Sequence, residues 1–134
     1  MVNTYIKGNK AELEFRKIFR TIGYRDWKPS RARYNNNDLF GLFDGVLVAK
    51  KGAPIENLVH WGNVIFFQMK STPSHFYKAR GEIRKWEGEV YSDHVTLMVV
   101  LREGKDAYRI WTLRGGIELD ETHTFKSDKH VQQL

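Results

Sequence analysis

The sequence predicts a single α/β domain, built on a central mixed β-sheet with helices on its faces. The chain has 134 residues, a length typical of one domain, and 41% of them are apolar, which suffices for a hydrophobic core. Amphipathic helical patterns alternate with short apolar runs in the order helix, two or three strands, helix, two strands. That order is typical of an α/β domain.

The first predicted element is an amphipathic helix over residues 9–22. Asn9 can cap its start, with Glu12 in the reciprocal position of a capping box, and Gly23 follows as a stop signal. Apolar side chains recur at steps of three and four residues and so share one helix face: Ala11, Phe15, Ile18, Phe19 and Ile22.

The middle of the chain predicts two strands. Residues 25–37 are basic, aromatic and irregular, and the limits of any strand there stay open. Strands are expected over residues 43–49 and 64–69, and the second run, Val-Ile-Phe-Phe-Gln-Met, is typical of a central strand. Glycines and a proline between them, over residues 50–62, indicate a long connection.

The second half predicts a helix over residues 74–90 and strands over 95–101 and 107–113. The continuous apolar run of the first of these strands is typical of a buried strand. From about residue 115 the chain is a C-terminal extension whose structure the sequence leaves undefined. A helical stripe of apolar residues predicts the buried face of the helix: Phe76, Ala79, Ile83, Trp86 and Val90.

The charge favours a polyanionic partner, chiefly nucleic acid. The formal net charge is +6, although ordinary solubility charge explains such a value as well. Basic residues dominate residues 1–36, and the stretch from Arg114 leans acidic. A second basic group completes a layout that suits a phosphate backbone: Lys70, Lys78, Arg80, Arg84 and Lys85.

Composition also excludes several kinds of site. The chain has no cysteine, which rules out disulfides, thiolate zinc sites, iron–sulfur clusters and cysteine nucleophiles. No apolar run is long enough for a membrane span, and no secretory leader is recognised, so a cytoplasmic protein without membrane contact is expected. The five histidines lack zinc-ligand spacing.

Polar residues on two neighbouring predicted strands carry the candidate chemistry. Asp44 opens one strand, and Gln68 and Lys70 lie two apart near the end of the next, so these two side chains share a face. If the strands are hairpin neighbours, all three converge at one edge of the sheet. Carboxylate and amide oxygens suit Mg²⁺ or Mn²⁺, with the Met69 carbonyl as a third ligand. Lys70 could hold an attacking water or stabilise charge on a phosphate. The alternative is a surface Asp, a strand-end Gln and a solvated Lys.

This arrangement resembles the PD-(D/E)XK nuclease superfamily. In that pattern an acidic residue opens one strand, a (D/E)-x-K motif closes the next, and a helix follows. Asp44 and Gln68-Met69-Lys70 match these two motifs. The first helix, Lys7-Gly8-x-x-Ala11-Glu12-x-Glu14-Phe15 leading to Gly23-Tyr24, resembles the opening of archaeal-type Holliday junction resolvases and their phage relatives. The segment from Asp38 to Asp44 also resembles the stretch before their metal-binding strand.

The resemblance implies a restriction-endonuclease-like core with the element order αβββαβ. It further implies a metal-dependent DNA endonuclease whose Mg²⁺ or Mn²⁺ is held by Glu12, Asp44, Gln68 and the Met69 carbonyl, with Lys70 as the catalytic lysine. The expected product carries a 5′ phosphate, and the expected partner is branched DNA. A homodimer is implied, because two symmetric nicks in a four-way junction need two active sites.

Two departures from the family pattern keep other functions open. Gln68 replaces the second acidic residue and removes one negative charge, and Phe43 stands where the family has proline. A non-catalytic nucleic-acid-binding module with a weakened site is therefore one alternative. A restriction, homing or phage-processing nuclease acting on other DNA is another.

Several residues around this site allow two interpretations each. Glu12 is either a metal ligand or the capping-box partner of Asn9, and Asp38 competes with Asp44 as a ligand but also suits a turn. Aromatic residues among the basic segments either stack on bases or pack the rim of the domain. Phosphate contacts are expected from Lys7, Lys10, Arg31, Arg33, Ser71 and Thr72. A solvated loop for the arginines and strand-end capping for Ser71 and Thr72 are the alternatives.

Overall fold

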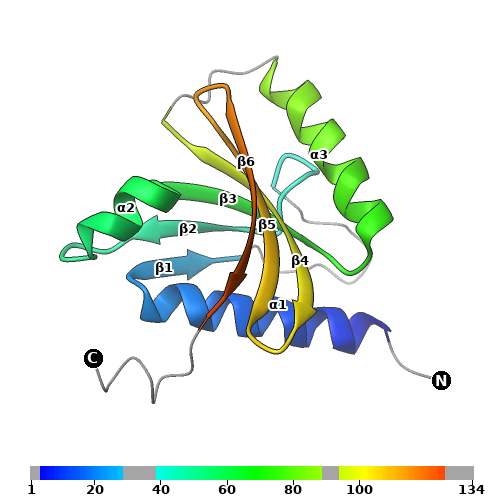
Figure 1. Cartoon of the computed structure of the whole chain (residues 1–134), viewed down its shortest axis with the longest axis horizontal. Coiled ribbons are helices and arrows are strands. Elements are labelled where there is room, and N and C mark those ends of the chain that lie inside the picture. The colour runs from blue at the N-terminus through cyan, green and yellow to red at the C-terminus, as the bar shows by residue number, and fades with distance from the viewer. Residues whose placement is uncertain (1–3, 29–38, 89–93, 126–134) are drawn as a thin grey trace.

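The strands of the sheet lie side by side in the order in which they occur along the chain. The computed structural model describes residues 4–28, 39–88 and 94–125. It shows a six-stranded mixed sheet with helices packed on it (Figure 1). In chain order the elements are α1 (Thr4–Thr21), β1 (Tyr24–Trp27), β2 (Gly45–Ala49), α2 (Ile55–Trp61), β3 (Val64–Lys70), α3 (Pro73–Glu87), β4 (Thr96–Gly104), β5 (Ala107–Arg114) and β6 (Ile117–Thr124).

The pairing of β3 makes the sheet mixed. β1, β2 and β3 pair antiparallel, β3 and β4 pair parallel, and β4, β5 and β6 pair antiparallel. A parallel pair needs a crossover connection, which α3 supplies. The predicted α/β class with a mixed sheet and flanking helices is confirmed. β2 and β3 are antiparallel neighbours, which meets the condition for bringing Asp44 close to the end of β3.

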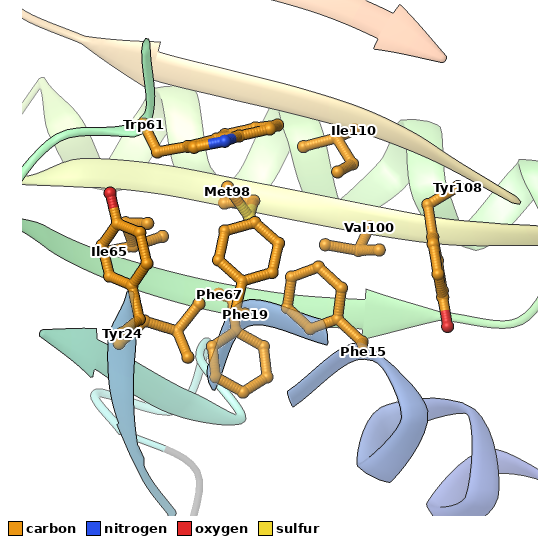
Figure 2. Close-up of a cluster of buried hydrophobic side chains, with 11 residues drawn as sticks. Phe15, Phe19, Tyr24, Trp61, Ile65, Phe67, Met98, Val100, Tyr108 and Ile110 are labelled. Carbon is orange, nitrogen blue, oxygen red and sulfur yellow. The ribbon is translucent and has the colours of Figure 1, made fainter. Parts of the chain in front are cut away.

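Alternate residues of β3 serve two separate cores. Ile65 and Phe67 pack with Phe15 and Phe19 of α1, as Figure 2 shows, and the rings of Phe15 and Phe67 have centroids 5.4 Å apart. Phe66 packs instead in the cluster that contains the buried stripe of α3. Because successive strand residues point to opposite faces, α1 covers one face of the sheet and α3 covers the other.

The helices depart from the sequence expectation in two places. α1 begins at Thr4, so Asn9 lies inside the helix and the predicted capping box with Glu12 is wrong. A weak helix former costs about 1 kcal/mol inside a helix, and packing of the apolar face outweighs this cost. The expected connection over residues 50–62 contains α2, whose end is held by the burial of Trp61. In the described part of the chain, no helix is long and apolar enough to cross a membrane.

The C-terminal extension continues the sheet as β6. Gly115 and Gly116 have φ of +56° and +79°, which favours the tight turn that leads from β5 back into β6. The register then runs unbroken from Arg114↔Ile117 to Ala107↔Thr124. No clear strand pattern is visible in these residues because β6 is an edge strand with most of its side chains exposed. The stripe of α3 is buried as predicted at Phe76, Ala79 and Ile83, while Val90 lies outside the described residues.

Candidate metal-binding and active site

Asp44 is fixed by a tight hairpin that leads into β2. Leu39 and Phe43 exchange backbone hydrogen bonds of 2.8 and 3.0 Å, and Phe40 and Gly41 between them have φ of +54° and +69°. Phe43 is buried in the core on the α3 face, which anchors the end of the hairpin. Asp44 therefore leaves the hairpin at a defined position directly before β2.

Backbone pairing then brings Asp44 to the end of β3. The Asp44 N–H donates to the Phe67 carbonyl at 2.8 Å, and the Met69 N–H donates to Asp44 Oδ2 at 2.7 Å. The backbone of Asp44 thus pairs with Phe67, next to the Gly45↔Phe67 pair at which the β2–β3 register begins. The N–H and C=O groups of one strand residue point toward the same neighbouring strand. Because the Met69 N–H points toward Asp44, the Met69 carbonyl also faces that side of β3. The Asp44 carboxylate and the Met69 carbonyl, two of the expected ligand groups, therefore lie at the same end of the β2–β3 pair.

Gln68 provides an unusual buried oxygen at this place. Its residue is only 5% exposed, and its Oε1 is buried without a hydrogen-bond partner among the described residues. Leaving a buried acceptor unpaired costs about 1–3 kcal/mol, so such atoms are rare in native proteins. Amide and carboxylate oxygens are donors that suit a hard divalent cation.

Lys70 faces a hollow between β3 and the start of α3. The hollow has a volume of about 280 Å³ and is lined by Lys70, His75, Lys78, Ala79 and Glu82. Across the described part of the chain, neither Lys70 nor Lys78 forms a salt bridge. Two ammonium groups against one carboxylate give this lining a net positive charge, which suits an anion.

Ser71 and Thr72, next to Lys70, differ in their roles. The Thr72 hydroxyl accepts a hydrogen bond from the His75 N–H at 3.3 Å and caps the start of α3. Thr72 therefore caps a helix and not a strand end, and its contact with a phosphate stays a prediction. Ser71 is exposed beside it.

Glu12 lies at the same end of the sheet but on α1. It is buried, and Lys28 Nζ lies 2.7 Å from its Oε1 in an ion pair that lacks hydrogen-bond geometry. Lys28 follows Trp27, which pairs with Val46 near the start of β2. The structure thus places Glu12 near the edge where Asp44 lies, and its role as a metal ligand stays a prediction.

Glu14, the other glutamate of the resolvase-like helix motif, has a structural role. Its carboxylate accepts hydrogen bonds from the Tyr108 hydroxyl at 2.5 Å and from Arg102 at 3.2 and 3.3 Å. Partial burial opposes ionisation, but the hydrogen bonds from Tyr108 and Arg102 outweigh it and lower the pKa of Glu14. Glu14 therefore ties α1 to β4 and β5.

Many of the basic residues are neutralised within the fold. Arg16 and Arg20 both bind Asp26, and the two arginines of the second basic group, Arg80 and Arg84, pair with acids of β6. The expected phosphate-binding surface is therefore smaller than the sequence suggests. Lys10 is exposed on α1, which also carries Lys7, whereas Arg31, Arg33 and Asp38 lie outside the described residues.

The aromatic residues of the basic segments mostly pack. Tyr24 and Trp61 are buried in the core on the α1 face, and the Tyr24 hydroxyl donates to the Gly62 carbonyl at 2.6 Å. For these two residues the packing interpretation is confirmed. Trp27 is exposed at the end of β1, whereas Tyr34 lies outside the described residues and Tyr5 is described only in its backbone.

Sequence reasoning missed a second cluster of metal-ligating residues. His60 on α2 meets Glu121 and His123 on β6. The spacing of two between Glu121 and His123 would have shown that they share a face, had β6 been recognised as a strand. Nothing local indicates that His60 joins them, because sixty residues of folded chain lie between.

Comparison with known proteins adds nothing to this geometry. No family model, curated protein or solved structure matches the chain. The case for a function therefore rests on the motifs and on where the fold places them.

Proposed function

We propose that this protein is a Mg²⁺-dependent endodeoxyribonuclease with a restriction-endonuclease-like core. Its active site consists of Asp44, Gln68, the Met69 carbonyl and Lys70. The observation that carries the proposal is the buried Gln68 Oε1, which has no hydrogen-bond partner in the described residues and belongs to the residue before Met69, whose N–H donates to Asp44 Oδ2.

The topology supports this proposal. With α2 set aside, the chain runs α1, β1, β2, β3, α3 and β4, which follows the αβββαβ order that the resemblance implies. Antiparallel pairing puts the start of β2 beside the end of β3, and the parallel crossover puts α3 directly after the lysine. The acid and the Gln-x-Lys motif therefore meet for a structural reason and not by sequence pattern alone.

The chain itself would position the metal ligands. The Met69 N–H fixes the orientation of the Asp44 carboxylate through its 2.7 Å hydrogen bond. By alternation Gln68 shares the α3 face of β3 with Phe66, and burial of its side chain would restrict the position of the amide oxygen. When bound, Mg²⁺ would polarise the scissile phosphate and favour the deprotonation of an attacking water.

Lys70 would act on the other side of the phosphate. Its ammonium faces the positively charged hollow, where it could hold the attacking water or a non-bridging phosphate oxygen. Lys78 lines the same hollow and would contact the neighbouring phosphate. Resolvase-like selectivity for branched DNA and action as a homodimer follow by resemblance and form part of the proposal.

A binding module without catalysis is the second candidate, and one observation favours it. Gln68 is neutral, so the site has one negative charge fewer than an acid at this position would give. The affinity of a site for a divalent cation falls when the number of negatively charged ligands falls. Cleavage, and not DNA binding, is therefore the decisive measurement.

The experiment is a cleavage assay with Mg²⁺ or Mn²⁺ on end-labelled four-way junction, flap, linear duplex and single-stranded DNA. The wild type should cut, while Asp44→Ala and Lys70→Ala should lose cutting and keep most DNA binding. Lys50→Ala is the charge-matched control, because Lys50 is exposed, follows the end of β2 that is remote from Asp44, and belongs to neither basic group.

Three results would revise the proposal. Binding without cutting under either metal would favour the non-catalytic module. Cutting by the Asp44 and Lys70 variants at the wild-type rate would refute the site. The Gln68→Glu variant restores an acid and should keep or raise metal affinity, so a marked loss of its cutting would mean that the amide is used specifically.

A further inference from the structure

A second cluster of ligand side chains joins α2 to β6. It lies away from the proposed active site of Asp44, Gln68, Met69 and Lys70, which we name the Asp44 edge. His60 Nε2 lies 3.2 Å from Glu121 Oε1, and His123 Nε2 lies 3.5 Å from the same oxygen. One ligand atom from each of the three residues lies within 4.8 Å of the other two. The two clusters lie near opposite ends of β3. His60 is on α2, which ends just before β3 begins, and Lys70 is the last residue of β3, so the length of the strand, about 20 Å, separates them.

The separations match the edges of a metal tetrahedron. Zinc binds imidazole nitrogen and carboxylate oxygen at about 2.0–2.2 Å, so two ligands at tetrahedral positions lie roughly 3.4 Å apart. The two measured nitrogen–oxygen distances, 3.2 and 3.5 Å, bracket that value.

An unpaired nitrogen provides an independent observation at the same place. His123 Nε2 is buried and has no hydrogen-bond partner among the described residues. The side chains as a whole are partly open, with exposures of 37% for His60, 42% for Glu121 and 25% for His123. An ion could therefore reach the cluster from solvent and bind a nitrogen that has no hydrogen-bond partner in the described part of the chain.

Aromatic packing holds the two imidazoles in place. Both rings contact the buried Trp61, with centroids 4.4 Å away for His60 and 4.9 Å away for His123. His123 also stacks on Phe125 at 5.9 Å. Trp61 is itself fixed, because its carbonyl accepts a hydrogen bond from Thr96 at 2.7 Å. Ligands oriented in this way lose little freedom when a metal binds.

We infer that His60, Glu121 and His123 form a binding site for a divalent transition metal, with Zn²⁺ as the best fit. Two imidazoles and one carboxylate suit Zn²⁺ far better than Mg²⁺, which prefers oxygen ligands throughout. Three protein ligands leave a fourth position for water. The metal links α2 to the edge strand β6 and so stabilises the end of the sheet, a role that does not depend on the proposed nuclease activity.

The test is Zn²⁺ titration of the untagged full-length chain by calorimetry, with Mg²⁺ present in large excess to saturate any oxygen-ligand site. Co²⁺ provides a second readout, because its visible absorption distinguishes tetrahedral from octahedral coordination. We expect one tight equivalent of Zn²⁺, a tetrahedral Co²⁺ spectrum and a higher melting temperature with Zn²⁺.

Matched variants decide between this site and others. His60→Gln and His123→Gln should each weaken Zn²⁺ binding at least tenfold, and the double variant should abolish it together with the thermal shift. His75→Gln removes a histidine outside the cluster and should leave this equivalent of Zn²⁺ bound. Absence of Zn²⁺ binding by the wild type would overturn the inference, as would undiminished binding by the folded double variant.

Discussion

Two charged regions of this molecule differ in how completely their polar atoms are matched. The first, which we name the arginine–carboxylate network, joins α3 and β5 to β6 through Arg80, Arg84, Arg109, Glu118 and Asp120. Arg84 binds both oxygens of Glu118, at 2.7 and 3.0 Å, and Arg109 binds both oxygens of Asp120, at 2.8 and 2.9 Å. In the second region, the Asp44 edge, Gln68 Oε1 is buried without a partner and Lys70 forms no salt bridge within the described ranges.

The difference shows that a dense charge pattern is not by itself a binding surface. Hydrogen bonds from Arg84 lower the pKa of Glu118, and those from Arg109 lower the pKa of Asp120, so both acids stay ionised and neutralise the arginines at neutral pH. Arg80 Nε is buried without a hydrogen-bond partner among the described residues, but the paired guanidinium groups of Arg84 and Arg109 have little affinity left for an external ligand. The unmatched oxygen and ammonium of the Asp44 edge can gain interactions only from something outside the described chain.

The largest expected effect is a loss of cleavage activity when Asp44 is changed, with no such loss when an acid of the arginine–carboxylate network is changed. Asp44→Asn should lower the single-turnover cleavage rate by about 10²–10³-fold, because it removes the carboxylate charge from the metal site. Its melting temperature should hold, since the Asn side-chain oxygen can still accept the Met69 N–H. Asp120→Asn, in the network, is the control and should keep wild-type cleavage. A large loss of stability in Asp44→Asn would instead make Asp44 a structural residue.

Asp26 is a carboxylate with arginine partners, and its contribution to the free energy of unfolding can be measured. Hydrogen bonds from Arg20 and Arg16 lower its pKa to about 2 from the ordinary 3.8. A lowered pKa stabilises the fold at pH above about 4, and this contribution is lost as the pH falls toward 2. Because Arg20 is partly exposed, we expect Asp26→Asn to cost about 1–2 kcal/mol at pH 7.

Urea denaturation of both proteins at pH 7 and near pH 2 measures this contribution. The difference between wild type and Asp26→Asn should shrink at the acidic pH. An equal difference at both pH values would show that the Asp26 charge does not stabilise the fold.

Gln68→Met sharpens the comparison because it removes the unmatched oxygen itself. Methionine has a similar shape and no polar oxygen. The free energy of unfolding of the variant should therefore equal that of the wild type or exceed it by up to about 1 kcal/mol. Metal-dependent cleavage should nevertheless fall about tenfold or more. Chemical denaturation and cleavage rates measured on one preparation test both parts. A loss of stability would indicate that Gln68 has a structural partner and would remove the main support for the proposed site.

The smallest expected effect comes from opening the network. Glu118→Gln should cost less than about 1 kcal/mol, because the Arg84–Glu118 pair is exposed. Freeing Arg84 should raise the affinity for DNA slightly. It should also steepen the slope of log affinity against log salt concentration by up to about one, as expected for one additional phosphate contact. Fluorescence anisotropy over a range of salt concentrations measures both quantities. An unchanged salt slope would place DNA away from this face.

Periodicity predicted the elements whose burial repeats regularly. The stripes of α1 and α3 and the apolar runs of β3, β4 and β5 were recognised because a regular element buries side chains at its own period. α2 was missed because it is short and its stability comes from tertiary contacts, such as the bond from Asn57 to the Ile22 carbonyl at 2.8 Å. β6 was missed because an exposed edge strand does not need an apolar pattern.

Within the candidate site, the sequence by itself determined the chemistry available. It placed Asp44, Gln68 and Lys70 at the ends of predicted strands, with the oxygen and nitrogen groups that a phosphodiester and a hard cation require. It also excluded every cysteine-based site. These conclusions depend on residue type and local spacing, which folding does not alter.

Only the tertiary structure decided which charges are already used and which distant residues meet. The acids of β6 neutralise arginines of α3 from more than thirty residues away, and His60 meets His123 although about half of the chain separates them in sequence. Such contacts depend on the order and direction of strands, and a strand period of two does not encode which neighbour a strand will have. The sequence therefore specified the groups, and the sheet specified their partners.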